Sequence, residues 1–310
     1  MIKPRRLRQG DKIAIIAPAS PGPKSKLMLG VRRLRQAGFE VYIHPYSYDR
    51  RGYLAGKDER RARALMEVFT DHRIRAVFCA RGGFGCARLL EHVDLKSIFA
   101  NPKIFVGYSD ITILLQAFSN GGFATFHGPM PAIDLARANY KFALENLLKA
   151  ITSPQPLGRL HNPRKLGPFK KYHGGRASGI ITGGNISLLQ KLIGTKFMPS
   201  FKNKIVFLED TLEEPYRIDG YLGHLFASTD IARAAGFIFG EWVNVKITRR
   251  NYPSLTLDQV IDDYFGKLKV PILTNVACGH GRQNLTIPLG VKAKVDADKK
   301  VIEILESAVI

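Results

Sequence analysis

Cysteine is scarce in this chain, with only Cys79, Cys86 and Cys278 among 310 residues. No two of them have C-x-x-C spacing, and the sequence contains no H-E-x-x-H motif. His, Cys and carboxylate residues do not cluster at the spacing of metal ligands either. These absences exclude a disulfide framework, argue against a structural zinc site and are typical of a reducing compartment. The sequence therefore gives no reason to expect a metal or another cofactor.

Long apolar runs are also missing, and none approaches the ~20 residues of a membrane span. The N-terminus is similar to a signal peptide, because "MIKPRRLRQG" is basic and "IAIIAPA" is apolar. However, Asp11 and Lys12 separate the two parts, and the apolar stretch is at the lower limit of roughly 7–15 residues. We interpret this stretch as the first β-strand of a cytoplasmic protein that does not contact a membrane.

Acidic residues are few relative to basic ones, 26 against 47, and the net charge is +21. Such an excess predicts attraction to an anionic partner, of which nucleic acid is one candidate. The basic residues are spread along helix-like segments, and aromatic residues do not alternate with them as a base-stacking surface requires. We therefore expect a solvated basic surface or an anionic substrate rather than nucleic acid. A non-catalytic module that binds an anionic polymer stays open as an alternative.

Residues 1–150 alternate short apolar runs with helical patterns, which is typical of an α/β domain. Because each strand is separated from the next by a helix, the strands should form a parallel sheet covered on both faces, Rossmann-like or flavodoxin-like. Strands are predicted at 12–19, 39–45, 74–80, 103–109 and 123–129, and helices at 25–38, 57–71, 86–93 and 110–120.

The composition changes near residue 150. Residues 151–175 are rich in proline and glycine without a sustained apolar period, which indicates a linker between domains. Residues 176–310 then predict a smaller α/β domain. This domain ends in an alternating stretch that is typical of a hairpin around "DADKK", residues 296–300.

Ser109 is the first residue of chemical interest. Ligands of open parallel sheets bind beyond the carboxyl ends of the strands, and "RGGFG" and "GYSD" follow two consecutive predicted strands. With Gly107 before it, Ser109 fits a nucleophile elbow, although Ile111 replaces the last glycine of G-x-S-x-G. The backbone N–H groups of Asp110 and Gly83 could then bind an oxyanion. The alternative is that Ser109 only caps a helix.

A serine nucleophile needs a base and an acid that orients it. Among eight histidines, His280 stands out because a Gly-His-Gly turn presents it at a strand end, and His127 in "FHGP" is its rival. Glu209 ends the apolar strand "KIVFLED", where a carboxylate is costly to bury unless it is paired. Asp210 would point to the other face of that strand. Ser109, Glu209 and His280 are therefore a candidate triad that the residues alone leave open.

Other signals are weaker. "RGGFG" lacks the lysine of a P-loop and the third glycine of G-x-G-x-x-G, so it is an ordinary turn as readily as a phosphate cradle. Asn185 could cap a helix or contact a substrate. Tyr216 and Arg217 could line a cleft, pack in the core or lie on the surface.

Five motifs in order along the chain together resemble the LD-carboxypeptidase family of serine peptidases. They are "RGGFGCARLL", "FVGYSDIT", "ASGIITGGNISLLQKLIGT", "FLEDTLEEPYRID" and "CGHG". The resemblance implies a cytoplasmic hydrolase, usually a homodimer, that removes the terminal D-alanine of murein tetrapeptides. Its active site would lie in the cleft between an N-terminal α/β domain and a smaller C-terminal domain.

The family's functional residues fall on matching positions of this chain. The resemblance implies a catalytic triad of Ser109, Glu209 and His280, with oxyanion donors from the backbone of Gly83 and Asp110. The candidates for substrate contacts are Gly82, Asn185, Tyr216 and Arg217. The chain departs from the pattern in two places: Gly220 stands where a basic residue is expected, and the basic charge, including "FKKYHGG", is more pronounced.

A branch of the same family is an alternative, because its members hydrolyse an aminoacyl-nucleotide antibiotic for self-immunity with the same triad. That function needs an aromatic residue that stacks on adenine from a C-terminal loop. Trp242 is the only tryptophan and the residue to inspect.

Overall fold

The computed structural model describes residues 1–248 and 253–310, and its strands form two sheets. The first sheet has the order β12-β5-β4-β3-β1-β2, and all its neighbours are parallel except β12, which runs antiparallel to β5. This confirms the predicted parallel α/β arrangement of the N-terminal half. The strands are β1 (Lys12–Ile16), β2 (Glu40–Ile43), β3 (Ile74–Cys79), β4 (Ile104–Gly107), β5 (Thr125–His127) and β12 (Ile287–Leu289).

The helices between these strands are α1 (Lys24–Gln36), α2 (Asp58–Thr70), α3 (Leu95–Ala100), α4 (Thr112–Asn120) and α5 (Lys141–Thr152). The prediction of a helix over 86–93 is wrong, since only the short 3-10 helix η2 (Cys86–Leu89) forms there. The Asp94 carboxylate accepts hydrogen bonds from the backbone N–H groups of Lys96 and Ser97, so it caps a new helix at Leu95. No helix of the described residues is both long and apolar enough to cross a bilayer.

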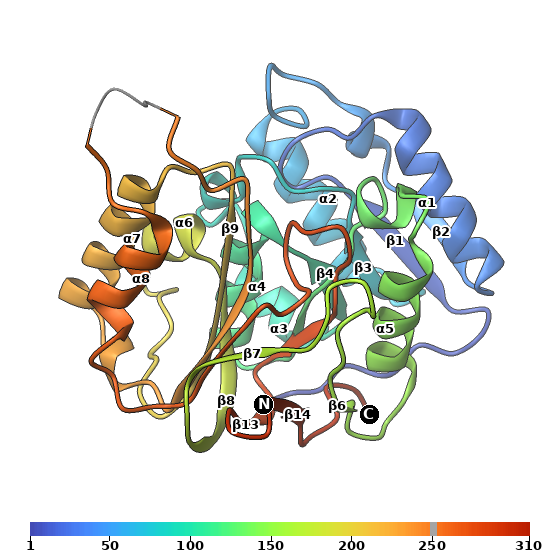
Figure 1. Cartoon of the computed structure of the whole chain (residues 1–310). Helices are drawn as coiled ribbons and strands as arrows, with labels where there is room; N and C mark the ends of the chain where they lie inside the picture. The colour runs from blue at the N-terminus through green and yellow to red at the C-terminus, as the bar shows by residue number, and fades with distance from the viewer. Residues whose placement is uncertain (249–252) are drawn as a thin grey trace.

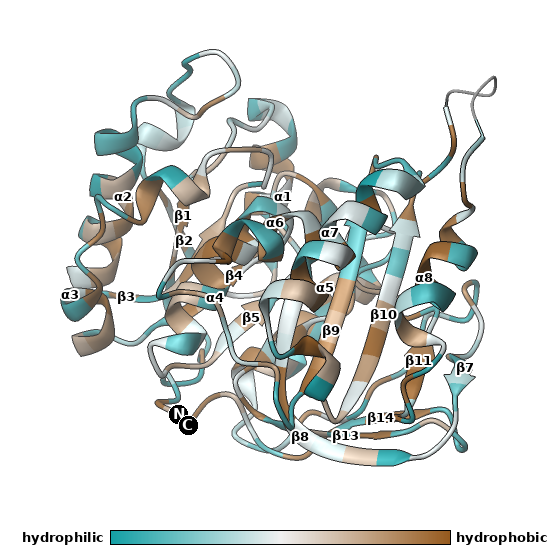
Figure 2. Cartoon of the chain, turned by 90° about the vertical axis from the view of Figure 1, so that its left-hand side faces the viewer, coloured by the Kyte–Doolittle hydropathy of each residue, from teal (hydrophilic) through white to brown (hydrophobic). Residues whose placement is uncertain are grey.

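The second sheet has the order β6-β14-β13-β8-β9-β10-β11-β7, and β8 to β11 are parallel. Helices α6 (Ile186–Leu189), α7 (Pro215–Ser228) and α8 (Leu257–Phe265) cover the face turned away from the first sheet (Figures 1 and 2). The predicted hairpin around 296–300 is confirmed as β13 and β14. The strands are β6 (Gly158–Arg159), β7 (Lys170–His173), β8 (Arg176–Asn185), β9 (Ile205–Thr211), β10 (Gly236–Val243), β11 (Ile272–Thr274), β13 (Lys292–Asp296) and β14 (Val301–Ile304).

Two connections between the halves differ from the sequence interpretation. The segment 151–175, expected to be a linker, contributes β6 and β7 to opposite edges of the second sheet. In the other direction, β12 from the C-terminal part pairs with β5 and completes the first sheet. Edge strands of two to four residues need few apolar positions, so composition does not reveal them. The two halves are therefore joined by shared sheet edges.

The side chains of β9 alternate between two hydrophobic cores. Ile205 and Phe207 belong to the core that also contains the first sheet. Val206 and Leu208 belong to the core under α7 and α8. Because side chains alternate along a strand, the next residue, Glu209, faces the first sheet. This periodicity places a fully buried carboxylate on the side of the second sheet that faces the first sheet.

Candidate active site

Ser109 occupies the corner between β4 and α4, as the sequence predicts. It is the first residue of the 3-10 helix η3 (Ser109–Ile111), and its φ of 63° lies in the left-handed region. Such a conformation costs a residue with a side chain about 1–3 kcal/mol and is common at functional sites. No side-chain hydrogen bond caps η3 or α4. The structure therefore does not support the alternative that Ser109 serves as a helix cap.

The Gly-rich turn after β3 lies directly against Ser109. A Cβ atom on Gly82 would be 2.8 Å from the Cβ of Ser109 and 3.0 Å from its Oγ. Gly83 has a φ of 115°, and a Cβ there would be 2.2 Å from Oγ of Ser20. Ser20 holds the turn, since its N–H donates to the carbonyl of Gly82 and its hydroxyl accepts from the N–H of Phe84 at 3.1 Å. Only glycine allows this approach of backbone to Ser109.

The N–H groups of Gly83 and Asp110 were the predicted oxyanion donors. Neither donates a hydrogen bond to another group in the described part of the chain. The Asp110 carboxylate is buried and accepts from the N–H of Cys86 at 2.8 Å, which ties the serine corner to the Gly-rich turn. Burial raises the pKa of Asp110, and the Cys86 hydrogen bond opposes this rise. The two N–H groups thus come from adjoining, mutually fixed turns.

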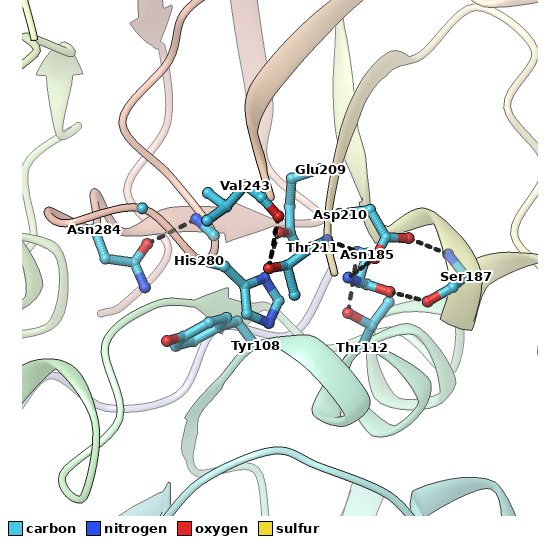
Figure 3. A network of polar contacts seen from close by, with 12 residues as sticks. Tyr108, Thr112, Asn185, Ser187, Glu209, Asp210, Thr211, Val243, His280 and Asn284 are labelled. Atoms are coloured by element: carbon cyan, nitrogen blue, oxygen red, sulfur yellow. Dashed lines mark hydrogen bonds and ion pairs between the residues drawn. The ribbon is translucent and has the colours of Figure 1, made fainter. Parts of the chain in front are cut away.

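Glu209 and His280 form a direct pair. Nδ1 of His280 lies 2.7 Å from Oε2 of Glu209, which is fully buried (Figure 3). Burial disfavours the charged form of each group, but the opposite charge and the hydrogen bond outweigh it. As a result, the pKa of Glu209 lies below its ordinary value and that of His280 above. The carboxylate therefore holds the imidazole and stabilises its protonated form.

The turn that carries His280 is fixed on several sides. Gly279 has a φ of 97°, and a Cβ there would be 2.3 Å from Oε2 of Glu209. Its N–H donates to Oδ1 of Asn284 at 3.0 Å. The Arg137 guanidinium donates to the carbonyl of Gly281. The approach of His280 to Glu209 therefore depends on glycine at 279 and on contacts from Asn284 in the same loop and Arg137 in another segment.

Tyr108 connects His280 to the serine corner. Its ring centroid lies 5.0 Å from that of His280, and Ser109 is the next residue along the chain. No hydrogen bond joins Ser109 Oγ to His280 within the described residues; such catalytic contacts are often long in the absence of substrate. The structure thus brings Glu209 and His280 into contact and places Ser109 beside their neighbour.

His127, the rival base, is buried behind Tyr108. Its ring lies 5.6 Å from the Tyr108 ring and 4.8 Å from that of Phe207. Neither of its ring nitrogens has a hydrogen-bond partner among the described residues. Burial lowers the pKa of His127 to about 4. His127 is therefore neutral near pH 7, and unlike His280 it forms no hydrogen bond with a carboxylate.

Asn185 lies in a second polar network beside the pair (Figure 3). Its Nδ2 donates to Oδ1 of Asp210 at 3.1 Å, and its Oδ1 accepts from the hydroxyl of Ser187 at 2.6 Å. Asn185 precedes α6, but its side chain does not cap that helix. Burial and the neighbouring charge of Glu209 raise the pKa of Asp210 to about 7. Asp210 binds Asn185 and takes no part in holding His280.

Three aromatic and basic candidates lie elsewhere. Tyr216 is 53% exposed on α7 and lines a separate cavity of about 360 Å³, and Arg217 pairs with Glu213 at 3.7 Å. Trp242 lies on β10, where its ring packs 6.1 Å from Phe239. None of the three contacts the Glu209–His280 pair.

Sequence reasoning missed Ser20, Tyr108 and Arg137. Ser20 follows β1 at the edge where the other two turns lie, so the rule that selected those turns could have found it. Tyr108 and Arg137 carry no such signal, because their contacts link segments far apart in the chain. Within the described residues, no three His, Cys, Asp or Glu side chains are grouped to hold a metal ion.

A serine at a strand–helix corner and an imidazole held by a buried carboxylate are features that serine hydrolases share. Two sequence profiles make the assignment specific: the LD-carboxypeptidase N-terminal domain matches residues 13–128, and the LD-carboxypeptidase C-terminal domain matches residues 178–295. The chain belongs to the LD-carboxypeptidase family, a family of serine peptidases, and is a hydrolase with carboxypeptidase activity.

Individual relatives cover almost the whole chain. A probable murein peptide carboxypeptidase of Bacillus subtilis is 36% identical over 96% of this chain and 92% of its own. The microcin C7 self-immunity protein MccF of Escherichia coli is 29% identical over 97% of this chain and 94% of its own. The structure of a muramoyltetrapeptide carboxypeptidase from Oxalobacter formigenes superposes with a TM-score of 0.82, at 27% identity, and covers 94% of this chain and 97% of its own. Membership of a peptidase family argues against the alternative of a non-catalytic module that binds an anionic polymer.

Proposed function

We propose that the protein is a serine-type L,D-carboxypeptidase that removes the terminal D-alanine from murein tetrapeptides. The observation that carries the proposal is the contact of 2.7 Å between Glu209 and His280, next to the strained Ser109. The names of the B. subtilis and O. formigenes relatives support murein peptides as the substrate.

In the proposed reaction, His280 Nε2 takes the proton of Ser109 as its Oγ attacks the carbonyl carbon before D-alanine. Glu209 accepts from Nδ1–H, which keeps Nε2 free to act as the base and stabilises the imidazolium. The N–H groups of Gly83 and Asp110 bind the oxyanion, and loss of one such donor costs about 3–4 kcal/mol in other hydrolases. D-Alanine leaves with the proton from His280, and water then releases the tripeptide and restores Ser109.

The test is D-alanine release from a murein tetrapeptide, followed by mass spectrometry. The wild type should remove one alanine, and Ser109→Ala should fold normally without turnover. Turnover of the Ser109→Ala protein at a rate near that of the wild type would rule out Ser109 as the nucleophile.

The immunity-type hydrolase is the second candidate, and the similarity to MccF favours it. On this reading an aromatic ring must be free to stack on a base. Trp242 lies within β10 against Phe239 instead of in a loop, which favours the murein peptide. An aminoacyl sulfamoyl adenosine assayed beside the tetrapeptide separates the two, since only the immunity enzyme should bind it tightly.

We also propose a cytoplasmic homodimer, in keeping with the family and with three buried, unpaired cysteines. Light scattering of the purified protein should give twice the mass of the 34.5 kDa chain. A mass of one chain at micromolar concentration would contradict the dimer.

A further inference from the structure

A charged cavity of about 430 Å³ opens beside His280. Part of its lining is the turn that carries His280, and the charged side chains of Arg137, Glu241 and Arg282 also line it. A second cavity of about 390 Å³ shares Glu241 and Arg282 with the first. Arg137 fixes the His280 turn through the carbonyl of Gly281, but the proposed triad and oxyanion donors do not use the charges of Glu241 and Arg282. They therefore need an explanation of their own.

A β-bulge directs Glu241 into this cavity. Phe239 on β10 pairs with Leu208 on β9, and Trp242 pairs with Asp210. Two residues of β10, Gly240 and Glu241, therefore lie opposite one residue of β9, Glu209. Phe239 and Trp242 pack into the core under α7 and α8. The extra residue re-aims the strand and turns Glu241 to the opposite face, toward His280.

The Glu241 carboxylate lies on the backbone of the His280 turn. A Cβ atom on Gly281 would be 1.7 Å from Oε2 of Glu241, so the carboxylate occupies the space that a side chain at 281 would fill. Two glycines of the G-H-G turn thus have separate roles. Gly279 admits Glu209, and Gly281 admits Glu241.

The backbone N–H of Glu241 donates to the carbonyl of Cys278 at 3.5 Å, but its carboxylate forms no hydrogen bond or ion pair with the described part of the chain. Burial raises its pKa, and the positive charge of Arg137 opposes this rise. Arg137 is committed elsewhere, because it donates to the Gly281 carbonyl and lies 3.6 Å from Asp134. A partly buried carboxylate without a partner is unfavourable, and a cation of the substrate would supply that partner.

We infer that Glu241 and Arg282 are specificity-determining residues for the third residue of the peptide, whose side chain ends in an ammonium and a carboxylate group. The inference rests on the proposed function. Glu241 binds the ammonium group, and the exposed Arg282, at the junction of the two cavities, binds the carboxylate. A diaminodicarboxylic acid such as 2,6-diaminopimelate has this chemistry, whereas lysine offers the ammonium group alone.

The departing D-alanine does not account for Glu241. Its nitrogen is a neutral amide until the bond is cut, so in the bound substrate it has no positive charge for Glu241. A cavity of about 430 Å³ is also far larger than one alanine requires. A long side chain with a charged end fits both observations.

Four synthetic tetrapeptides that differ only at the third residue test the inference. They carry 2,6-diaminopimelate, lysine, 2-aminopimelate or norleucine, so that ammonium and carboxylate are present together, singly or not at all. For each, kcat/KM for D-alanine release is measured with the wild type, Glu241→Gln and Arg282→Gln. Glu59→Gln, an exposed carboxylate on α2, is the matched control.

The wild type should prefer each ammonium peptide over its ammonium-free counterpart by about tenfold, the contribution of one charge-assisted hydrogen bond. Glu241→Gln should bring this ratio near one, and Glu59→Gln should leave it unchanged. Arg282→Gln should remove the preference for the carboxylate in the same way.

The opposite outcomes are distinguishable. Equal wild-type rates on all four peptides overturn the subsite and leave the carboxypeptidase standing. An equal loss of kcat/KM on all four peptides with Glu241→Gln would show that Glu241 only shapes the His280 turn. An equal loss of kcat/KM with Arg282→Gln would show that Arg282 binds the D-alanine carboxylate. Each result overturns the assignment of the residue that was replaced. Release from none of the peptides overturns the proposed function itself and the subsite with it.

Discussion

Nδ1 of His280 and Oε2 of Glu209 lie 2.7 Å apart, although 71 residues separate them in the chain. The end of β9 supplies the carboxylate, and the turn after β11 supplies the imidazole (Figure 3). Between these strands lies β10, where Gly240 leaves room, because a Cβ there would be 2.8 Å from the Cβ of Glu209. The pair therefore depends on the arrangement of three neighbouring parallel strands.

The pH dependence of kcat/KM should identify the base. His280 must be neutral to accept a proton, and its pKa is raised above 6.5. Activity should therefore fall as the pH drops through a value above 6.5, with a single protonation on the acid side. If His127 were the base, activity would persist down to about pH 4, its own pKa. Initial rates between pH 4 and 9 decide between the two histidines.

Replacing Glu209 by glutamine should lower kcat by about 10³–10⁴-fold, because the imidazole loses the carboxylate that sets its tautomer. The pKa of His280 should fall as well, which moves the acid limb of the pH profile to lower pH. The melting temperature should fall as well, because the buried His280 imidazolium loses the carboxylate whose attraction outweighs the cost of its burial. Glu67→Gln is the control, because Glu67 lies 2.9 Å from His44 in a second His–Glu pair. Equal losses in both variants would contradict a special role of Glu209.

Gly82→Ala should reduce kcat/KM by about 10²-fold, the effect of a small misplacement of a reacting group. The added methyl group would lie 3.0 Å from Oγ of Ser109 and displace it. Gly220→Ala is the matched control, because a Cβ there has no atom within 4 Å. Its activity should equal that of the wild type, with stability higher by about 0.5–1 kcal/mol from the helical alanine in α7. Full activity of Gly82→Ala would show that Ser109 tolerates displacement.

Ser20→Ala should lower kcat about tenfold and leave KM nearly unchanged. The reason is that the turn that presents Gly83 loses the hydrogen bond from Phe84 N–H to the Ser20 hydroxyl. The unpaired N–H should also cost about 1 kcal/mol of stability. Ser47→Ala removes a comparable buried hydroxyl, which donates to the carbonyl of Ile15 at 3.1 Å. Urea unfolding should show similar losses for both variants, while steady-state kinetics should show a defect in Ser20→Ala alone.

Much of the fold follows from local patterns in the sequence. Apolar runs separated by helical periods predict β1 to β5 with α1, α2 and α4, although not α3 or α5, and alternation around 296–300 predicts the β13–β14 hairpin. Short edge strands escape such reasoning. The two residues of β6 and the three of β12 are too few to show a periodic pattern, so local sequence does not predict that the two halves join at their sheet edges.

The sequence by itself determined that a serine ends one strand and that a glutamate ends another, because strand ends and alternating faces are local properties. Its five ordered motifs also indicated the LD-carboxypeptidase family. Only the tertiary structure decided that His280 rather than His127 holds Glu209, that Ser20 anchors the Gly-rich turn and that a bulge aims Glu241 at the same turn. Each of these depends on contacts between segments far apart in the chain. Such contacts exist only after both sheets have packed together.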